Sequence, residues 1–174
     1  MPIDQTYRIM LVLGGARSGK SRYAQAVAEA AGGRLVFVAT AQAFDAEMTD
    51  RIRRHQADRD HRWTTVDAPV DLAGAISAVD AEDTVVLIDC LTLWASNLLL
   101  GDEDGDARLA ELAEVLGKMR AKVLLVANEV GLGIVPDNAL ARRFRDLAGT
   151  INQRIAAIAD RVHMTVAGIP IVVK

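Results

Sequence analysis

The residues from Gly14 to Ser21 have the types and the spacing to bind the phosphates of a nucleotide. They read Gly14-Gly15-Ala16-Arg17-Ser18-Gly19-Lys20-Ser21, which matches the pattern G-x-x-x-x-G-K-[ST] of a phosphate-binding loop. In such a loop, backbone N–H groups and the start of a helix surround a polyphosphate. The pattern assigns Lys20 to the β- and γ-phosphates and the Ser21 hydroxyl to Mg²⁺. The alternative is a glycine-rich turn that matches by accident.

Asp89 follows the apolar run Val85–Ile88 and is the second candidate ligand for Mg²⁺. A carboxylate at the end of a buried strand can hold the metal beside the loop serine, directly or through water. The alternative role is an N-cap for the helix that begins near Leu91, because aspartate caps helices well. The presence of the phosphate-binding loop favours the metal role.

His55 is a candidate nucleophile. It continues the helical face of Met48 and Ile52, and five arginines crowd the same segment: Arg51, Arg53, Arg54, Arg59 and Arg62. Nearby cations disfavour the imidazolium, so the ring stays neutral and able to attack a phosphorus atom. The same arginines suit polyphosphate oxygens. A partly buried histidine with a structural hydrogen bond is the other reading.

Two further acids have open roles. Asp67 could be a second functional acid or a simple loop or cap residue, and its sequence context favours neither. Asn128 and Glu129 begin a loop that contains glycines and a proline and follows a buried strand, so we expect Glu129 to reach the substrate. It could orient a substrate hydroxyl or accept its proton; otherwise it is a surface acid.

Short apolar runs alternate with helix-forming segments, which predicts an α/β fold with a mostly parallel sheet and helices on both faces. We expect strands at Arg8–Leu13, Arg34–Ala39, Val85–Ile88, Val123–Ala127 and Ile171–Val173. We expect helices at Ser21–Ala31, Ala46–Arg59, Val70–Val79, Leu91–Leu99, Ala107–Met119 and Ala139–Ile158. Gly14–Ser21, Thr40–Gln42, Asp89 and Asn128–Gly131 follow strand ends directly, so they should line one surface of the sheet, where parallel sheets bind ligands.

Composition limits the class of protein. At 174 residues, the chain suits one domain over residues 1–174 with a core of small aliphatic side chains, since aromatic residues make up only 4%. A net charge of −3 gives no general attraction to nucleic acid, and no nucleic-acid motif is present. No apolar stretch approaches the roughly 20 residues that span a bilayer. The single cysteine, Cys90, fits a reducing compartment, so we expect a cytoplasmic protein.

Four segments together resemble one family, the bifunctional adenosylcobinamide kinase / adenosylcobinamide-phosphate guanylyltransferases. They are Gly14–Ser21 with Arg22; Ala39-Thr40-Ala41-Gln42; Asp45-x-Glu47-Met48 with Arg51-Ile52-x-x-His55; and Asn128-Glu129-Val130-Gly131-x-Gly133-Ile134-Val135-Pro136. The resemblance continues through Arg142–Gln153 to Gly168-Ile169-Pro170 and so covers nearly the whole chain. The phosphate-binding loop is generic, whereas the histidine segment and the Asn128–Pro136 run are specific.

The resemblance implies a P-loop NTPase fold with a recombinase-type core, a homotrimer, and a two-step enzyme. The enzyme phosphorylates adenosylcobinamide with ATP or GTP, and then transfers GMP from GTP to adenosylcobinamide phosphate through a histidine, here His55. Besides the loop, the guanine-nucleotide contacts of the family fall on Thr40, Ala41, Gln42, Ala57, Asp58, Arg59, Asp60, Asp67 and Asp89. The competing readings are a kinase with a single activity and a structural His55, and a nucleotide-binding regulatory subunit without catalysis.

Overall fold

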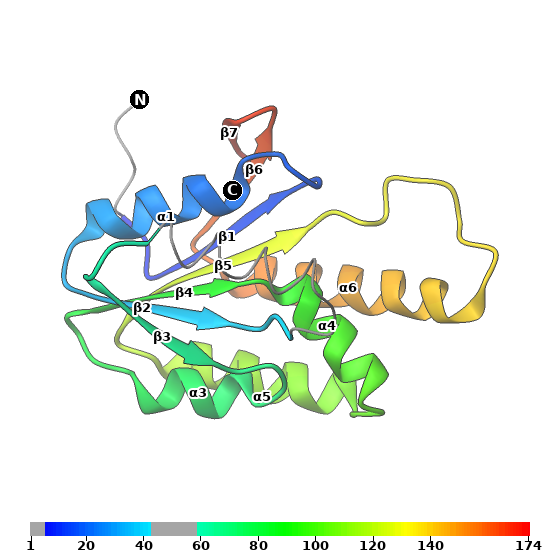
Figure 1. Ribbon diagram of the computed structural model, residues 1–174, viewed down its shortest axis with the longest axis horizontal. Coiled ribbons are helices and arrows are strands. Elements are labelled where there is room, and N and C mark those ends of the chain that lie inside the picture. The colour runs from blue at the N-terminus through cyan, green and yellow to red at the C-terminus, as the bar shows by residue number, and fades with distance from the viewer. Residues whose placement is uncertain (1–5, 43–58) are drawn as a thin grey trace.

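A seven-stranded sheet forms the centre of the computed structural model, which describes residues 6–42 and 59–174 (Figure 1). The strands are β1 (Ile9–Gly14), β2 (Arg34–Ala39), β3 (Trp63–Asp67), β4 (Thr84–Asp89), β5 (Lys122–Asn128), β6 (Arg161–Val166) and β7 (Ile169–Val172). Their order across the sheet is β3-β2-β4-β5-β1-β6-β7. Among these strands, β7 alone runs antiparallel to its neighbour, so the predicted mostly parallel sheet is confirmed.

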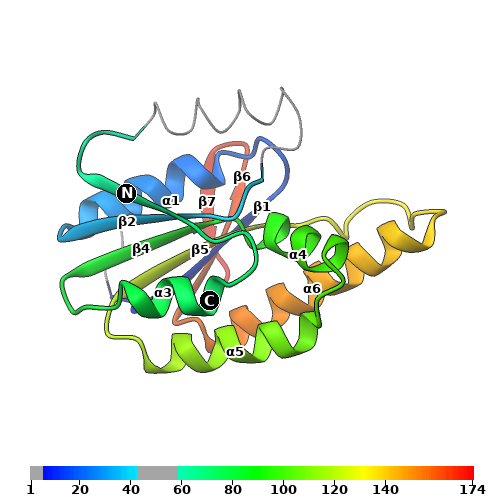
Figure 2. The same ribbon diagram turned by 60° about the horizontal axis from the view of Figure 1, so that its bottom comes forward.

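Helices cover both faces of the sheet and give three layers. They are α1 (Lys20–Ala31), α3 (Leu72–Ala78), α4 (Leu91–Leu100), α5 (Gly105–Lys118) and α6 (Ala139–Ile158). Figure 2 shows α1 on one face and α3, α5 and α6 on the other. Two hydrophobic clusters fill the spaces: alternate strand residues such as Val12 and Val126 pack with α1, and their neighbours such as Leu11 and Leu125 pack with α3 to α6. The strands are apolar throughout because both faces are covered.

The structure contains two strands that the sequence pattern did not predict. β3 lies at one edge of the sheet and contains only exposed and half-buried residues, and β6 has buried polar residues, His163 and Thr165, between its apolar ones. The predicted strand Ile171–Val173 lies mostly within β7, at the opposite edge of the sheet. β6 and β7 form a hairpin whose two turn residues, Ala167 and Gly168, have φ values of 50° and 82°, as a tight hairpin turn requires.

The predicted helices are found with shifts of a few residues at their ends, except for residues 46–59. That segment, with His55, lies outside the described residues apart from Arg59. The loop after β5 and the beginning of α6 project beyond the carboxyl edge of the sheet (Figure 1). No helix in the described ranges is long and apolar enough to cross a membrane.

Candidate active site

The loop between β1 and α1 has the shape of an anion-binding turn. Gly19 immediately precedes α1 with a φ of 91°, and Arg17 has a φ of 56°, so the backbone turns through left-handed positions. The Ser18 N–H donates to the Gly15 carbonyl at 3.3 Å, which closes the turn. The Lys20 ammonium donates to the same carbonyl at 3.2 Å, and the residue as a whole is only 9% exposed. Its positive charge is therefore held over the loop, where a phosphate would bind.

Gly14 is required by contact rather than by backbone conformation. A Cβ atom at this position would collide with the Ser18 Oγ and lie 2.8 Å from the Thr165 carbonyl oxygen, which belongs to the backbone of β6. Glycine at position 14 therefore allows the loop to pack closely against the end of β1 and against β6. Thr165 was not singled out in the sequence, because the loop pattern carries no information about the neighbouring strand.

The hairpin turn between β6 and β7 supports the loop from outside. The Gly168 N–H donates to the Ser18 carbonyl at 2.8 Å. A Cβ atom on Gly19 would lie 3.2 Å from the Gly168 Cα, so two glycines allow the turn and the loop to meet. This contact joins residues far apart in the chain, so no local sequence pattern predicts it.

The carboxyl ends of the strands are aligned as predicted. Gly14 pairs with Asn128 of β5 on one side and with Thr165 of β6 on the other. Ala39 of β2 pairs with both Asp67 and Asp89. The phosphate-binding loop, both acids and the Asn128 segment therefore lie along one edge of the sheet, where open parallel sheets bind ligands.

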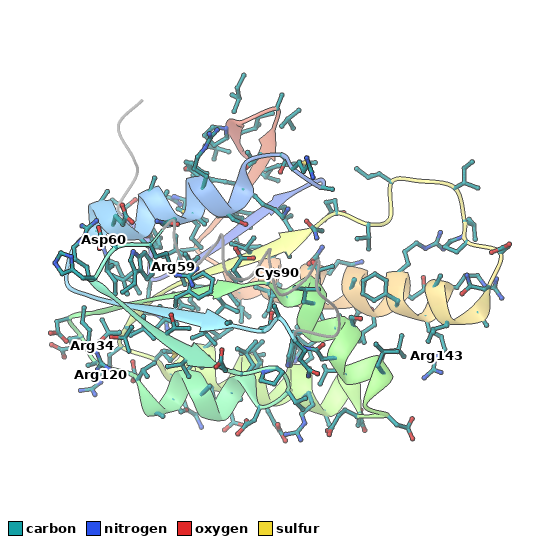
Figure 3. All side chains as sticks on the ribbon, viewed as in Figure 1. Arg34, Arg59, Asp60, Cys90, Arg120 and Arg143 are labelled. Atoms are coloured by element: carbon teal, nitrogen blue, oxygen red, sulfur yellow. The ribbon has the colours of Figure 1, made fainter. Side chains whose placement is uncertain are left out.

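A pocket of about 400 Å³ opens beside the loop, between α1 and the sheet. It is lined by Ser21, Arg22, Gln25, Ala26, Glu29, Phe37, Arg59, Leu87 and Asp89. Arg59 is labelled in Figure 3. Its guanidinium lies over the Phe37 ring, 3.5 Å from the ring centre, and so keeps a cation at the pocket wall. The pocket thus combines a positive charge with the two oxygen ligands proposed for a metal.

Ser21 and Asp89 fit Mg²⁺ because both are oxygen donors on the same pocket. Protein sites for this ion typically supply one or two ligands and leave the others to phosphates and water. The residues present therefore suit a metal that arrives with a nucleotide.

Thr40 has a structural role at the end of β2. Its hydroxyl donates to the Cys90 carbonyl and accepts from the Cys90 N–H, both at 2.8 Å, and its own carbonyl accepts from Asn97 at 2.7 Å. Thr40 is fully buried, whereas Ala41 and Gln42 are partly exposed beyond it.

Burial and the nearby Asp89 charge raise the pKa of the Cys90 thiol to about 11, so this cysteine is not a reactive thiolate at neutral pH.

Asp60 and Asp67 lie at the two ends of β3. The exposed Asp67 ends the strand beside Ala39. Asp60 accepts from the Arg62 backbone N–H and forms an ion pair with the Arg62 guanidinium at 2.7 Å, and these bonds lower the pKa of its carboxyl to about 2. Asp60 therefore fixes the turn that enters β3. Ala57 and Asp58, like His55, lie outside the described residues.

Asn128 and Glu129 are fixed through their backbones. The Asn128 N–H donates to the Thr92 hydroxyl at 2.7 Å, and the Glu129 N–H donates to the Gly14 carbonyl at 3.1 Å. The Asn152 amide donates to the Asn128 carbonyl at 3.2 Å and to the Glu129 carboxylate at 3.1 Å. Thr92 and Asn152 were not predicted as site residues. They attach the end of β5 to α4 and α6 and so fix the edge on which the ligand would lie.

Comparison with known proteins gives matches along nearly the whole chain. Residues 10–173 match the family described as cobinamide kinase / cobinamide phosphate guanyltransferase. The chain is 45% identical to the bifunctional adenosylcobalamin biosynthesis protein CobP of Pseudomonas aeruginosa, covering 94% of this chain and 96% of that protein. It is 42% identical to the bifunctional adenosylcobalamin biosynthesis protein CobU of Salmonella typhimurium, over 95% and 99% of the two chains.

Solved structures with low sequence identity share the fold. The ATPase EscN of the enteropathogenic E. coli type III secretion system superimposes with a TM-score of 0.64 at 10% identity, covering 92% of this chain and 43% of that one. The RadB recombinase superimposes with a TM-score of 0.51 at 15% identity, over 90% and 73% of the two chains. These similarities establish a P-loop NTPase fold, including the recombinase type of core.

Proposed function

Because the chain belongs to the cobinamide kinase / cobinamide phosphate guanyltransferase family, we propose that it catalyses two reactions in one domain. It phosphorylates adenosylcobinamide with ATP or GTP, and it transfers GMP from GTP to adenosylcobinamide phosphate to give adenosylcobinamide-GDP. The observation that carries the proposal is the loop from Gly14 to Ser21, with the Lys20 ammonium held above it and Asp89 on the same pocket as Ser21.

In the kinase reaction, the substrate hydroxyl attacks the γ-phosphorus, the bond to the β-phosphate oxygen breaks, and a nucleoside diphosphate leaves. Lys20 and the N–H groups of the loop stabilise the charge that develops on the phosphoryl oxygens. Ser21 and Asp89 would hold Mg²⁺, which neutralises phosphate charge when bound. Glu129 would orient the substrate hydroxyl or accept its proton, and the support is the hydrogen bond from the Asn152 amide that holds its carboxylate.

In the guanylyl reaction, a neutral His55 imidazole attacks the α-phosphorus of GTP and pyrophosphate leaves. A phosphate oxygen of adenosylcobinamide phosphate then attacks the same phosphorus, and the bond to histidine breaks. Two displacements allow the two substrates to react one after the other. The support is the family membership and the five arginines around His55 in the sequence.

The assembly and the location are part of the same proposal, and their support is the family membership. We propose a cytoplasmic homotrimer that binds GTP, ATP, adenosylcobinamide and its phosphate, with Mg²⁺ as cofactor. The contacts of Ala41, Gln42, Asp67 and Arg59 with the nucleotide belong to this proposal. Their support is the shared edge of the sheet and the position of Arg59 on the pocket.

The test is a labelling experiment with GTP that carries radioactivity in the α-phosphate. After denaturation, the wild-type protein should keep a covalent label that is labile in acid and stable in base, and His55→Ala should keep none. His61→Ala is the matched control, because His61 is an exposed histidine close by in the sequence, and its label should equal that of the wild type. If the wild type makes adenosylcobinamide-GDP without any label, the histidine route is wrong. A single-activity kinase would show Lys20-dependent phosphorylation and no guanylyl product.

A further inference from the structure

Asn128 is the last residue of β5, and its position places its side chain beside the phosphate-binding loop. It pairs with Gly14, the first residue of the loop pattern. Side chains along a strand alternate between faces, and Leu124 and Val126 lie on the face that packs against α1. Asn128 continues that alternation, so it lies on the same face as the loop and the start of α1.

Asp89 reaches the same face from the next strand. Its strand neighbours Val85 and Leu87 pack with α1, and Asp89 pairs with Val126, two residues before Asn128. Since neighbouring strands lie about 4.8 Å apart, Asn128 sits between the metal candidate on β4 and the loop on β1. A nucleotide phosphate bound by the loop with a metal at Asp89 would lie across this position.

The hydrogen bonds of Asn128 separate its backbone from its side chain. The backbone is bound on both sides, by the Thr92 hydroxyl at 2.7 Å and by the Asn152 amide at 3.2 Å. By contrast, within residues 6–42 and 59–174 the side-chain oxygen is buried and has no hydrogen-bond partner. A buried polar atom without a partner costs free energy, so no bond of this oxygen within the described residues explains an asparagine at this position.

We infer that the Asn128 carboxamide donates a hydrogen bond from its nitrogen to the terminal phosphoryl group of the bound nucleoside triphosphate. The residue as a whole is only half-buried although its oxygen is buried, which leaves the amide nitrogen as the end that a ligand can reach. This inference rests on the proposed function and adds a contact that distinguishes a triphosphate from a diphosphate.

The test compares two variants with a matched control. Asn128→Leu keeps the approximate shape of the side chain and removes its polar atoms, and Asn128→Asp keeps the shape but replaces the donor with an anion. The control is Thr84→Val, because the Thr84 hydroxyl is also buried without a partner in the described structure. Thr84 is the first residue of β4 and so lies at the opposite end of the strands from the phosphate-binding loop.

Binding of GDP and of a GTP analogue with a β,γ-methylene bridge is measured by calorimetry, together with thermal unfolding and kinase kcat. We expect Asn128→Leu to lose about tenfold to a hundredfold in affinity for the analogue and little for GDP, with a similar loss in kcat. Asn128→Asp should lose more, because its charge repels the phosphoryl group. The unfolding temperature of Asn128→Leu should equal or exceed that of the wild type, as for Thr84→Val, whose binding should not change.

The inference is overturned if Asn128→Leu loses the same affinity for GDP as for the analogue. It is also overturned if this variant unfolds at a lower temperature and keeps the wild-type preference for the analogue. Lys20→Ala, measured in parallel, separates this outcome from failure of the proposed function. If Lys20→Ala loses affinity while both Asn128 variants bind like the wild type, only the role of Asn128 is wrong. If Lys20→Ala also binds like the wild type, the assignment of the loop fails and the inference fails with it.

Discussion

Polar groups have different roles at the two ends of the strands, which we call the amino edge and the carboxyl edge of the sheet. At the amino edge, two aspartates bind the backbone where strands begin. The Asp160 carboxylate accepts from the N–H groups of Arg8 and Ile9 at 2.9 and 2.8 Å, at the start of β1. Asp80 accepts from those of Arg120 and Ala121, both at 2.9 Å, just before β5.

At the carboxyl edge, several polar side chains of the described residues form no such bonds to the backbone. In the described ranges, the Ser18 hydroxyl, the Asn128 side-chain oxygen and the Thr165 hydroxyl are buried without a partner, and all three residues lie around Gly14. Thr40 is an exception at this edge, since its hydroxyl is bonded to Cys90, and Thr84 is an exception at the other. Asp80 and Asp160 therefore stabilise the backbone at the amino edge, and we propose that the three buried groups at the carboxyl edge face a ligand.

The largest expected effect comes from filling the space at Gly14. In Gly14→Ala, the new methyl group must displace Ser18 or the backbone of β6, and the loop moves with it. A displacement of about 1 Å at a reacting group can cost roughly a hundredfold in rate, so kinase kcat should fall by about that factor. Steady-state assays measure this. In the control Gly117→Ala, on α5 with open space around the Cβ, kcat should stay unchanged and the free energy of unfolding should rise by about 0.5–1 kcal/mol.

A smaller effect is expected at the amino edge, and on stability instead of activity. Asp160→Ala leaves two backbone N–H groups without their acceptor, and because the site is partly open to water the free energy of unfolding should fall by only about 1 kcal/mol. Asp80→Ala should behave similarly. Urea unfolding measures the change, and GTP affinity at 25 °C serves as the control. A large loss of affinity with unchanged stability would contradict the division between the edges.

The smallest effect is a pH dependence at Asp160. Hydrogen bonds from the backbone of Ile9, and then of Arg8, lower the pKa of its carboxyl against the opposing effect of burial. A carboxyl with a lowered pKa in the folded state stabilises the protein above its unfolded pKa of about 3.9, and this contribution is lost as the pH falls through the folded value. The difference in unfolding free energy between the wild type and Asp160→Asn should therefore be constant above about pH 5 and shrink below pH 4. A difference that grows on acidification would show the opposite shift.

The sequence predicted the central strands and the phosphate-binding loop because their signals are local. A strand covered on both faces is a continuous apolar run, as in β1 and β5, and the loop is one contiguous motif. β3 and β6 were missed because an edge strand and a strand with buried polar residues lack that run. The contact of Gly168 with Ser18 and the bonds of Thr40 to Cys90 join distant segments, so no local pattern reveals them.

In the proposed function, the carboxyl edge binds a nucleoside triphosphate through Lys20. The most direct measurement is a calorimetric titration of the wild type and of Lys20→Ala with GTP and Mg²⁺, with thermal unfolding of both proteins. Removing the ammonium should weaken binding by about tenfold to a hundredfold, because it removes a charge-assisted contact with the phosphates, and should leave the unfolding temperature nearly unchanged. If Lys20→Ala keeps the wild-type affinity with the fold intact, Lys20 does not bind the phosphates.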